Sequence, residues 1–577
     1  MSRILPAALA LMAFSTLGGS PARTIVDVTD FGASPDSGED ATVPFQRAIQ
    51  AARAVRGPVT LTIPRGRYDF FSPRATRRAC YFSNATESGS DAMRTIAMDL
   101  SGLDGLTMEG NGARLVMRGA MTMLVAERCR KLSIRNLTFD FARPTVSEMK
   151  AVEKGEDYWI GEVHPDSTYR LIGSRVQWFG EDWSLFHNLV QHFDPITATV
   201  WRGSDPTEGA TAIDEIAPRR LRFSVPPESL DGVVVGRTYQ FRDTARTQTG
   251  MWFNRCQDVA MEDVNIRAMA GFGVLFQYTE GIDLRRIEVA PSPESRRTCA
   301  AAADILHFSG CRGAIRVRDS VLTAAHDDAI NIHGTHLQIV GREGARKIRV
   351  RFMHAQSWGF AAFTKGDSIE FVRWDTLQPY ESAKVLNVEM TADPREQILH
   401  LDRDAPSAIT LESDVVENVT WTPSVEIAGC QIAQIPTRGI LVTTRRPVRI
   451  VGNCFFRTPL PAILVEDDAA GWYESGPVHD LLIRGNDFFE CADETVSINP
   501  QNSVHTGPVH RNVRVEKNTF TMTGERAVSA KSTDRLRVTG NVFRSSSDAR
   551  QPVKTTDSNH VTVEGNRWET LPDSPAD

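Results

Sequence analysis

The sequence predicts an all-β protein: a right-handed parallel β-helix with an N-terminal helical cap and two inserted small β-barrel modules. Three observations favour this fold. A short strand–turn–aromatic unit recurs in the C-terminal part of the chain, the first residues read as strand, helix and strand, and two long segments interrupt the repeat. A chain of 577 residues exceeds what one ordinary core needs, and a solenoid can absorb such a length by adding coils.

The first 22 residues have the order of a cleavable export signal. Arg3 is followed by the apolar run Ile4–Leu17 and then by the small-residue stretch Gly18–Ala22. A positive residue, a short apolar segment and small residues at the cleavage site are the three parts of such a signal. We therefore predict a signal peptide over residues 1–22 and an exported protein, either periplasmic or secreted.

Residues 23–142 read as the start of the solenoid, with its cap and first coils. An extended segment at 24–33 precedes apolar residues at helical spacing over 43–55, and a second extended segment at 59–63 leads into a Pro-Gly turn. This order resembles the N-terminal cap of the pectin-lyase-like β-helix superfamily, in which a helix covers the first coil. An uncovered end would expose strand edges and the apolar stack to water.

Residues 424–577 carry the clearest repeat, in which an asparagine is followed two positions later by an aromatic residue. The pairs are Asn453 and Phe455, Asn486 and Phe488, Asn518 and Phe520, Asn541 and Phe543, and Asn566 and Trp568. The asparagines are 33, 32, 23 and 25 residues apart, which fits one coil of a β-helix with a loop added in the longer steps. We expect each asparagine to take a left-handed or turn conformation and each ring to stack on its equivalent. Related units at 132–139 and 259–266 indicate earlier coils; unrelated strands of a β-sandwich are the alternative interpretation.

Two regions, 143–249 and 338–423, break this rhythm. Both keep alternating apolar residues, as in 348–352 and 368–372, and are therefore predicted to be folded β modules and not disordered loops. We interpret them as small barrels attached to the side of the helix. They flank residues 250–337, which are expected to form further coils and which contain the strongest chemical motif.

Three aspartates, Asp304, Asp327 and Asp328, form the candidate catalytic group. Asp327 and Asp328 follow Asp304 by 23 and 24 residues, which is one coil, and neighbouring coils lie about 4.8 Å apart. Carboxyl groups this close cannot all ionise freely, so one should keep its proton while another remains a carboxylate. An acid beside a base is what cleavage of a glycosidic bond requires.

Strand alternation leaves the partner of Asp304 open. If Ile330 and Ile332 face the core, Asp327 lies on the outer face and is the better-exposed base. If Leu306 is matched with Ile330, Asp304 stacks on Asp328 instead. An outward ladder of aspartates without a catalytic role is the structural alternative, but these acids cluster with histidines between the two inserted modules.

Several other side chains are candidates for binding a sugar. A histidine-rich rim is more often sugar-binding or structural than metal-binding, and the spacing of the acids and histidines demands no cation. Trp472 could stack on a galactose ring and Glu474 could accept hydrogen bonds from its hydroxyl groups. The candidate substrate-binding residues are His307, His326, His333, Gln277, Glu466, Trp472 and Glu474, and neither a metal nor a cofactor is expected.

Composition argues against several classes of function. The formal net charge is −7 and no concentrated Lys/Arg block occurs, so a nucleic-acid partner is not expected. No internal apolar run approaches the roughly 20 residues that span a bilayer, so no membrane span is predicted. The eight cysteines include no CxxC pair, which argues against zinc ribbons and redox motifs and leaves any disulfide pairing unassigned.

Four segments together resemble glycoside hydrolase family 110. They are Ala303–Cys311, His326–His336, Met353–Phe360 and Leu464–Pro477, and the resemblance covers nearly the whole chain after the signal. Members of that family are exo-acting α-1,3-galactosidases with a β-helix and attached barrel modules, and they invert the anomeric centre. The resemblance implies that Asp304 is the general acid, that Asp327 or Asp328 directs the water, and that the substrate is a galactose-terminated oligosaccharide or glycan, linear or blood-group-B-like. The inserted modules also offer surfaces through which a homo-oligomer could form.

Other functions stay open at this point. A polygalacturonase-like hydrolase also combines a β-helix with an Asp and a downstream Asp-Asp, but its Gly-His-Gly and Arg-Ile-Lys signatures do not follow Asp328, where the chain reads Ile332-His333-Gly334-Thr335. A polysaccharide lyase would need a Lys or Arg base, which the segment does not supply convincingly. A non-catalytic β-helix adhesin or sugar-binding module would still bind saccharide after Asp304→Asn and would show no turnover.

Overall fold

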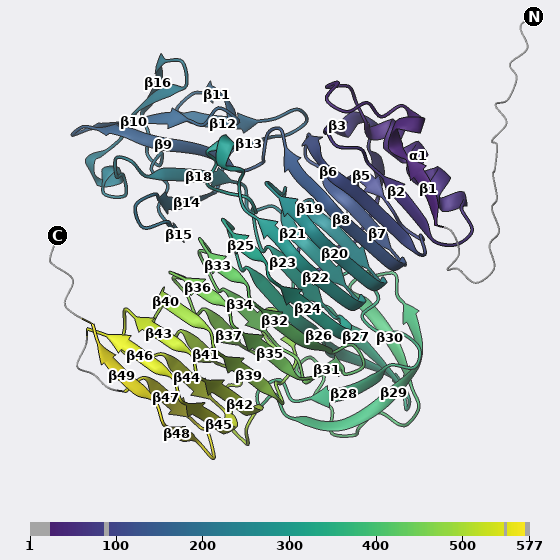
Figure 1. Ribbon diagram of the computed structural model, residues 1–577. Coiled ribbons are helices and arrows are strands. Elements are labelled where there is room, and N and C mark those ends of the chain that lie inside the picture. Colours follow the sequence, from purple (N-terminus) through teal and green to yellow (C-terminus); the bar gives the residue numbers. More distant parts are fainter. Residues whose placement is uncertain (1–22, 86–91, 547–550, 572–577) are drawn as a thin grey trace, which may run out of the picture.

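The computed structural model describes residues 23–85, 92–546 and 551–571, so the predicted export signal at 1–22 lies outside the described residues. Within the described part the protein is almost entirely β-structure. Figure 1 shows an elongated trunk of stacked coils that runs from α1 to β49, with one group of strands projecting near its middle and a second group packed along one side. In the same described part, no helix is long and apolar enough to cross a membrane, and the eight cysteines are all free.

The trunk is a parallel solenoid. Strands β8 (Arg130–Phe141), β20 (Gln257–Ile266) and β22 (Glu280–Val289) pair in parallel, with Leu132, Val259 and Ile282 in register. Successive side chains on a strand point to opposite faces, so the inward set of every coil joins one apolar core that runs along the trunk. The units at 132–139 and 259–266 therefore belong to neighbouring coils, as the repeat predicts.

The first elements follow the predicted order of strand, helix and strand. Strand β1 (Thr24–Asp27) pairs in parallel with β2 (Val59–Thr62), and α1 (Thr42–Ala54) lies between them in sequence. Buried residues of α1 recur at positions 45, 48, 49 and 52, which is the spacing of one helical face. That face packs into the trunk core, where the ring of Phe45 makes edge-to-face contacts with Tyr68 and Phe70 of β3 (Arg67–Phe71).

A buried ladder of asparagines joins the C-terminal coils. The Nδ2 of each asparagine except the last donates to the Oδ1 of the asparagine in the next coil, at 2.9 Å from Asn453 to Asn486 and 3.0 Å from Asn486 to Asn518. The following rings stack, with 4.7 Å between the centroids of Phe488 and Phe520. Strands on either side of these turns are β35 (Val448–Val451), β36 (Cys454–Phe456), β39 (Leu481–Arg484), β40 (Asp487–Cys491), β42 (His510–Glu516), β43 (Thr519–Met522), β45 (Thr533–Thr539), β46 (Val542–Ser545), β48 (Thr562–Glu564) and β49 (Arg567–Thr570).

The backbone at this ladder decides between the two conformations predicted for the asparagines, which lie in the turns between strands. The left-handed conformation belongs to the residue before each asparagine, as at Gly485 with φ of 63° and Lys517 with φ of 55°, and the asparagines themselves are not left-handed. The preceding residue makes the turn so that the asparagine side chain can point inward along the stack. There the side-chain amide pairs with two backbone groups of the preceding coil: Asn518 Oδ1 accepts from the Asn486 N–H, and Asn518 Nδ2 donates to the Ile483 carbonyl oxygen. A buried polar side chain requires such partners.

Removing one amide from the ladder is expected to destabilise the trunk. In Asn518→Ala the Asn486 N–H and Nδ2 lose their shared acceptor, and each buried donor left unpaired costs about 1–3 kcal/mol. We therefore expect a loss of about 2–5 kcal/mol and a lower midpoint of thermal unfolding. Glu564→Ala, at the exposed last residue of β48, is the control and should leave the midpoint unchanged; an equal midpoint for both variants would contradict the role of the ladder.

The first inserted region, 143–249, forms two antiparallel sheets. The larger has the order β15-β14-β18-β9-β10-β17-β16, and the smaller is β11-β12-β13. Their bounds are β9 (Ser147–Lys154), β10 (Tyr158–Val163), β11 (Thr168–Ile172), β12 (Arg175–Phe179), β13 (Ser184–Leu185), β14 (Leu189–Asp194), β15 (Thr199–Arg202), β16 (Ala212–Ala217), β17 (Arg220–Ser224) and β18 (Thr238–Arg242). A separate aromatic core fills this module, with Trp159 stacked on Phe223 at 4.5 Å. Among the described strands the larger sheet ends at β15 and β16 without closing, so the barrel predicted here is wrong.

The second inserted region closes into a barrel. Strands β26 (Ile330–Gly344), β27 (Lys347–Arg351), β30 (Glu396–Leu401), β29 (Pro379–Met390), β28 (Ser368–Val372) and β31 (Val415–Asn418) pair in that order, and β31 pairs back to β26. The first residues of β26 also pair with trunk strands. One continuous strand therefore passes from the trunk coil that follows Asp327 and Asp328 into the barrel, which fixes the barrel beside the candidate site.

Candidate active site

The three predicted aspartates lie together at the start of neighbouring trunk strands. Strands β23 (Leu306–Ser309), β26 and β34 (Ile440–Val442) pair in parallel, with Leu306, Ile330 and Ile440 in register. Two positions before these residues stand Asp304, Asp328 and Arg438, which therefore form one column across three coils. The Asp328 N–H donates to Asp304 Oδ1 at 3.2 Å. In this structure Asp304 therefore stacks on Asp328 and not on Asp327.

Asp328 is a fully engaged carboxyl group. Its Oδ1 accepts from the Thr437 hydroxyl at 2.6 Å and from the Arg438 N–H at 3.1 Å, and its Oδ2 accepts from the Arg438 guanidinium at 3.0 and 2.6 Å. Burial raises the pKa of Asp328 to about 7, with the guanidinium of Arg438 acting against this rise. A carboxylate has about four lone-pair sites, so none is left to take a proton from a water molecule.

Asp327 has the opposite environment. Arg246 donates to its Oδ2 at 2.9 Å and Arg202 to its Oδ1 at 3.4 Å, and 13% of its side chain is exposed. Burial raises the pKa of Asp327, but the charges of Arg246, Arg438 and other arginines outweigh burial and bring the pKa below its usual value. Asp327 is therefore ionised near neutral pH, with oxygen lone pairs available to solvent.

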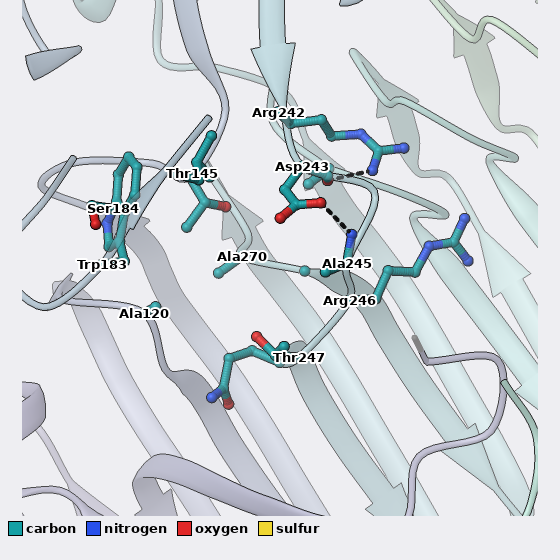
Figure 2. A pocket seen from close by; sticks show the side chains of 14 residues that line it. Ala120, Thr145, Trp183, Ser184, Arg242, Asp243, Ala245, Arg246, Thr247 and Ala270 are labelled. Atoms are coloured by element: carbon teal, nitrogen blue, oxygen red, sulfur yellow. Dashed lines mark hydrogen bonds between the residues drawn. The ribbon is translucent and has the colours of Figure 1, made fainter. Parts of the chain in front are cut away.

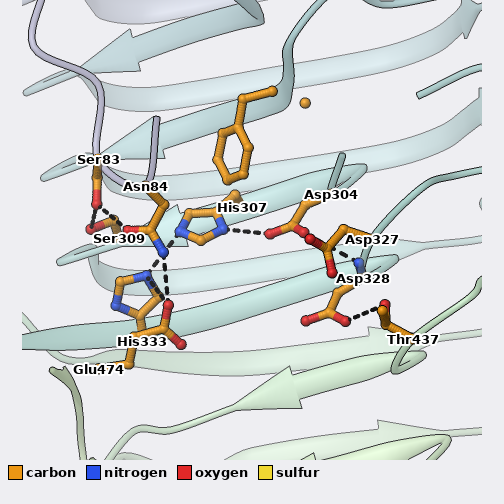
Figure 3. A network of polar contacts seen from close by, with 12 residues as sticks. Ser83, Asn84, Asp304, His307, Ser309, Asp327, Asp328, His333, Thr437 and Glu474 are labelled. Atoms are coloured by element: carbon orange, nitrogen blue, oxygen red, sulfur yellow. Dashed lines mark hydrogen bonds and ion pairs between the residues drawn. The ribbon is translucent and has the colours of Figure 1, made fainter. Parts of the chain in front are cut away.

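Asp304 is the carboxyl group that keeps its proton. It is buried, and burial together with the negative charge of Asp327 raises the pKa of Asp304 to about 8. Its Oδ2 lies 2.8 Å from His307 Nδ1, as Figure 3 shows. A protonated carboxyl beside an ionised one is the arrangement that allows one group to act as general acid and the other as general base.

These acids line a small pocket. The residues around it are Asn84, Arg246, Asp304, Asp327, Asp328, Asn331, Arg438, Leu441, Glu466, Trp472 and Glu474. They come from the trunk, from the segment that precedes β5 (Met93–Asp99), from the end of the first module and from the loop around β38 (Glu474–Ser475). With one exposed aromatic ring among polar groups, the lining has the character of a site for a small polyhydroxylated ligand.

Comparison with known proteins places the chain in a family. It is 36% identical over 544 residues to alpha-1,3-galactosidase A of Bacteroides thetaiotaomicron, covering 92% of this chain and 95% of the relative. It is 38% identical over 521 residues to alpha-1,3-galactosidase A of Bacteroides fragilis, covering 88% of this chain and 85% of the relative. The chain belongs to the α-1,3-galactosidase family.

Two further comparisons concern parts and shape. The family described as GLAA-B beta-barrel domain II matches residues 347–416, inside the closed barrel. Among solved structures, the adhesin PfbA of Streptococcus pneumoniae matches with a TM-score of 0.40 at 10% identity, over 94% of this chain and 97% of PfbA. An exopolygalacturonase of Yersinia enterocolitica matches with a TM-score of 0.37 at 11% identity, over 95% of this chain and 79% of the exopolygalacturonase. Similarity at this level supports no conclusion about this α-1,3-galactosidase family member.

Three of the predicted substrate-binding residues line the pocket of this family member. Trp472 is 46% exposed and stacks on His354 with 4.0 Å between ring centroids. Glu474 Oε1 accepts a hydrogen bond from Asn84 Nδ2 at 2.8 Å. Glu466 is the third of these residues, and burial together with the negative charge of Glu474 raises its pKa to about 7. These three residues border the same space as Asp304 and Asp327.

The other four predicted substrate-binding residues, His307, His326, His333 and Gln277, do not line it. All four are 3% exposed or less. His326 is held by Gln240 and Arg242 of the first module, and Gln277 accepts from the Ser83 N–H and so fixes the segment that contains Asn84. His307 and His333 lie behind Asp304. Their burial does not fit direct contact with a sugar, because inserted segments cover the outer face of these strands.

Three important residues were not predicted from the sequence. Arg438 could have been found, since Thr437-Arg438-Gly439-Ile440 occupies the place in its coil that Asp327-Asp328-Ala329-Ile330 occupies one coil earlier. Arg246 and Asn84 reach the pocket from remote connecting segments. No repeat or motif marks them, so the sequence alone offers no signal for their position.

Two groups near the pocket have the composition of a cation site: the three aspartates, and His307 with His333 and Glu474. In the first group, the guanidinium groups of Arg246 and Arg438 already face the carboxylates. In the second, the two Nε2 atoms lie 2.8 Å apart. Two imidazole nitrogens on one tetrahedral zinc would be about 3.3 Å apart, because each Zn–N bond is about 2.0–2.1 Å. The spacing fits a hydrogen bond, and we assign neither group as a metal site.

A second hollow lies between the first module and the trunk (Figure 2). Thr145, Trp183, Arg242, Asp243 and Arg246 are among its lining residues. Asp243 is the single acid in this lining, and its carboxylate accepts from the Ala245 N–H at 3.0 Å. The hollow therefore lacks an acid–base pair. Arg246 lines both spaces, so the hollow adjoins the acidic pocket.

Loss of the exposed ring should weaken substrate binding. Trp472→Ala removes an aromatic face beside the acids, and a ring that packs on a sugar contributes on the order of 1–3 kcal/mol, which corresponds to a roughly 10- to 100-fold lower kcat/KM. We expect most of this loss in KM. Trp374→Ala, whose ring is 41% exposed on the barrel and is not part of the pocket lining, is the control; equal kinetics for both variants would remove Trp472 from the site.

Proposed function

We propose that this protein is an exo-acting glycoside hydrolase that releases terminal α-1,3-linked galactose from oligosaccharides or glycans. The observation that carries the proposal is that Asp304 and Asp327 line one pocket in opposite environments: burial raises the pKa of Asp304, whereas the arginines around Asp327 bring its pKa below the usual value. The names of the relatives in the family support galactose as the sugar. The exposed Trp472 supplies the apolar surface that a pyranose ring needs.

The proposed reaction is a single displacement. Asp304 gives its proton to the glycosidic oxygen as the bond to the anomeric carbon breaks, and Asp327 takes a proton from the water that attacks this carbon from the opposite face. The products are free galactose and the shortened acceptor, and a proton returned from Asp327 to Asp304 restores the enzyme. Asp328 holds Arg438 and the column of side chains and is not assigned a proton transfer.

Inversion of the anomeric centre is proposed from the resemblance to glycoside hydrolase family 110. The carboxyl spacing does not favour it, because one oxygen of each acid lies within 4.8 Å of the others, whereas inverting enzymes hold their carboxyl groups about 6.5–9.5 Å apart. Rotation of Asp327 away from Asp304 on substrate binding would make room for the water. The stereochemistry of the product decides between inversion and retention.

Proton NMR during hydrolysis tests the activity and the stereochemistry together. The substrates are an α-1,3-linked galactosyl disaccharide and a blood-group-B-type trisaccharide, and the anomeric signal of free galactose is followed from the first minutes. We expect β-galactose first. α-Galactose first would replace inversion by retention, and no galactose from either substrate would overturn the proposal in favour of uronate hydrolysis or of binding without turnover.

Export and self-association remain proposals. The order of residues 1–22 supports export, with cleavage near Ala22, and N-terminal sequencing of protein from the periplasm or medium is the test. We also propose that the trunk winds in the right-handed sense, that α1 acts as its cap, and that the inserted modules can mediate a homo-oligomer. Sedimentation of the purified protein tests the oligomer.

A further inference from the structure

A buried hydrogen-bonded chain runs from Asp304 away from the pocket (Figure 3). Asp304 Oδ2 lies 2.8 Å from His307 Nδ1, and His307 Nε2 lies 2.8 Å from His333 Nε2. His333 Nδ1 lies 2.5 Å from the carbonyl oxygen of Gly334. Asp304, His307 and His333 are each 4% exposed or less, so these bonds are shielded from bulk solvent.

When both imidazoles are neutral, the Gly334 carbonyl fixes the direction of every bond in this chain. A carbonyl oxygen only accepts, so the hydrogen at this contact belongs to His333 Nδ1. A neutral His333 then has a lone pair at Nε2, and His307 must donate its Nε2–H to it. A neutral His307 in turn has a lone pair at Nδ1, which faces Asp304 Oδ2. That contact is satisfied only when Asp304 carries a proton and donates it.

A second arrangement with the same number of protons is less favourable. In it one proton has moved from Asp304 to His307 Nδ1 and another from His307 Nε2 to His333 Nε2, which leaves a carboxylate at Asp304 and a cation at His333. The cation would lie 3.5 Å from Glu474, which favours it. The carboxylate, however, would lie within 4.8 Å of ionised Asp327 without a hydrogen bond from a guanidinium, and two buried like charges this close are costly.

We propose that His307 and His333 are positioning residues that lock the proton on Asp304 in the resting enzyme, because their neutral tautomers present only an acceptor to its carboxyl group. The proton leaves this contact for the glycosidic oxygen when the glycosidic bond breaks. The inference rests on the proposed role of Asp304 as the acid. Charged and titratable groups that also face Asp304 are Asp327, Asp328, Glu474, Arg246 and Arg438. Burial keeps the pKa of His307 well below its usual value, with His333 adding to this effect, which agrees with a neutral imidazole.

Replacing His333 should reverse the tautomer of His307. His333→Phe removes the acceptor to which His307 Nε2 is hydrogen-bonded, so the hydrogen of His307 can move to Nδ1 and donate to Asp304, which stabilises the carboxylate. The alkaline limb of kcat/KM, near pH 8 in the wild type, should then move to lower pH by about one unit or more. We expect kcat/KM to fall about tenfold between pH 5.5 and 7.5 in the variant and less than about twofold in the wild type.

Two further variants separate this lock from simple packing. In His333→Gln the side-chain amide oxygen can accept from His307 Nε2, and the limb should return toward its wild-type position. His510→Phe removes another fully buried imidazole, which accepts from the Val478 N–H in the C-terminal coils, and should leave the limb in place. A folded His333→Phe enzyme that loses activity equally at every pH would overturn the proposal.

An infrared measurement tests the lock without turnover. The difference spectrum between the wild type and Asp304→Asn should contain the C=O band of a protonated carboxyl at pH 6.5, and the band should vanish as the pH rises past about 8. In His333→Phe the band should vanish at lower pH. A carboxylate at Asp304 at pH 6.5 would overturn the lock even if galactose is released, and a protonated carboxyl would support it even if the proposed substrate is wrong.

Discussion

Asp304→Asn is expected to lower kcat by about 10²- to 10⁴-fold, the contribution that a positioned general acid makes. The amide keeps the shape of the protonated carboxyl. Its Nδ2–H can donate to His307 Nδ1 and its Oδ1 can accept from the Asp328 N–H, as the acid does. Substrate binding should therefore persist while the proton for the leaving oxygen is missing. Initial rates with the galactosyl disaccharide, together with binding measured by calorimetry, give both quantities.

The same variant should be at least as stable as the wild type near neutral pH. The pKa of Asp304 is raised to about 8 in the folded protein from about 3.9 in the unfolded chain, so the folded state binds the additional proton between these values. Wild-type stability therefore falls as the pH rises from about 4 to about 8, and the amide, which does not titrate, removes this loss. We expect the variant to gain on the order of 1–3 kcal/mol at pH 7 and nothing at pH 4.

A matched substitution controls for the loss of one acid. Asp319→Asn changes a carboxyl that is 58% exposed on the trunk surface and should leave turnover and stability as they are. Near-normal turnover in a folded Asp304→Asn protein would remove Asp304 from the acid role. A stability gain that does not grow with pH would instead contradict its raised pKa.

The repetitive part of this molecule could be predicted because a solenoid makes distant contacts local in sequence. Asn486 meets Asn518 and Asp304 meets Asp328 since residues one coil apart stack, and a step of 23 to 33 residues is visible in the sequence. The same rule could have placed Arg438 beside Asp328. It was missed because the barrel insertion separates the two coils in the chain and hides the repeat.

What the sequence could not reveal depends on the segments that connect the trunk strands. Alternation puts the side chains of His307 and His333 outside the trunk, and an outward histidine next to an acid suggests contact with substrate. The segment at 81–84 and the loop around Glu474 cover them instead. Arg246 and Asn84 lie in connecting segments whose course is set by packing against the trunk, and no periodic pattern records that course.

Arg438→Met is expected to cost about 3–5 kcal/mol of unfolding free energy, the usual cost of removing one partner from a buried ion pair. Asp328 is fully buried, and in the variant it loses the two hydrogen bonds from the guanidinium. If the loop around residue 438 shifts, it also loses the bond from the backbone N–H of this residue. Without the guanidinium the pKa of Asp328 should rise further, since burial already raises it to about 7. The folded variant then binds a proton that the unfolded chain releases above about pH 4, so the deficit should shrink at low pH and grow toward pH 8.

A double substitution identifies the uncompensated charge as the cause of this loss. Asp328→Asn in the Arg438→Met background replaces the buried carboxylate with a neutral amide that can still accept from the Thr437 hydroxyl, and it should recover more than half of the lost stability. Thermal and urea unfolding of the four proteins of this cycle give the coupling between the two side chains directly. If Arg438→Met unfolds within about 1 kcal/mol of the wild type, or if the double variant is no more stable than Arg438→Met, the pair does not hold the column. Asp328 would then be free to compete with Asp327 for the role of base.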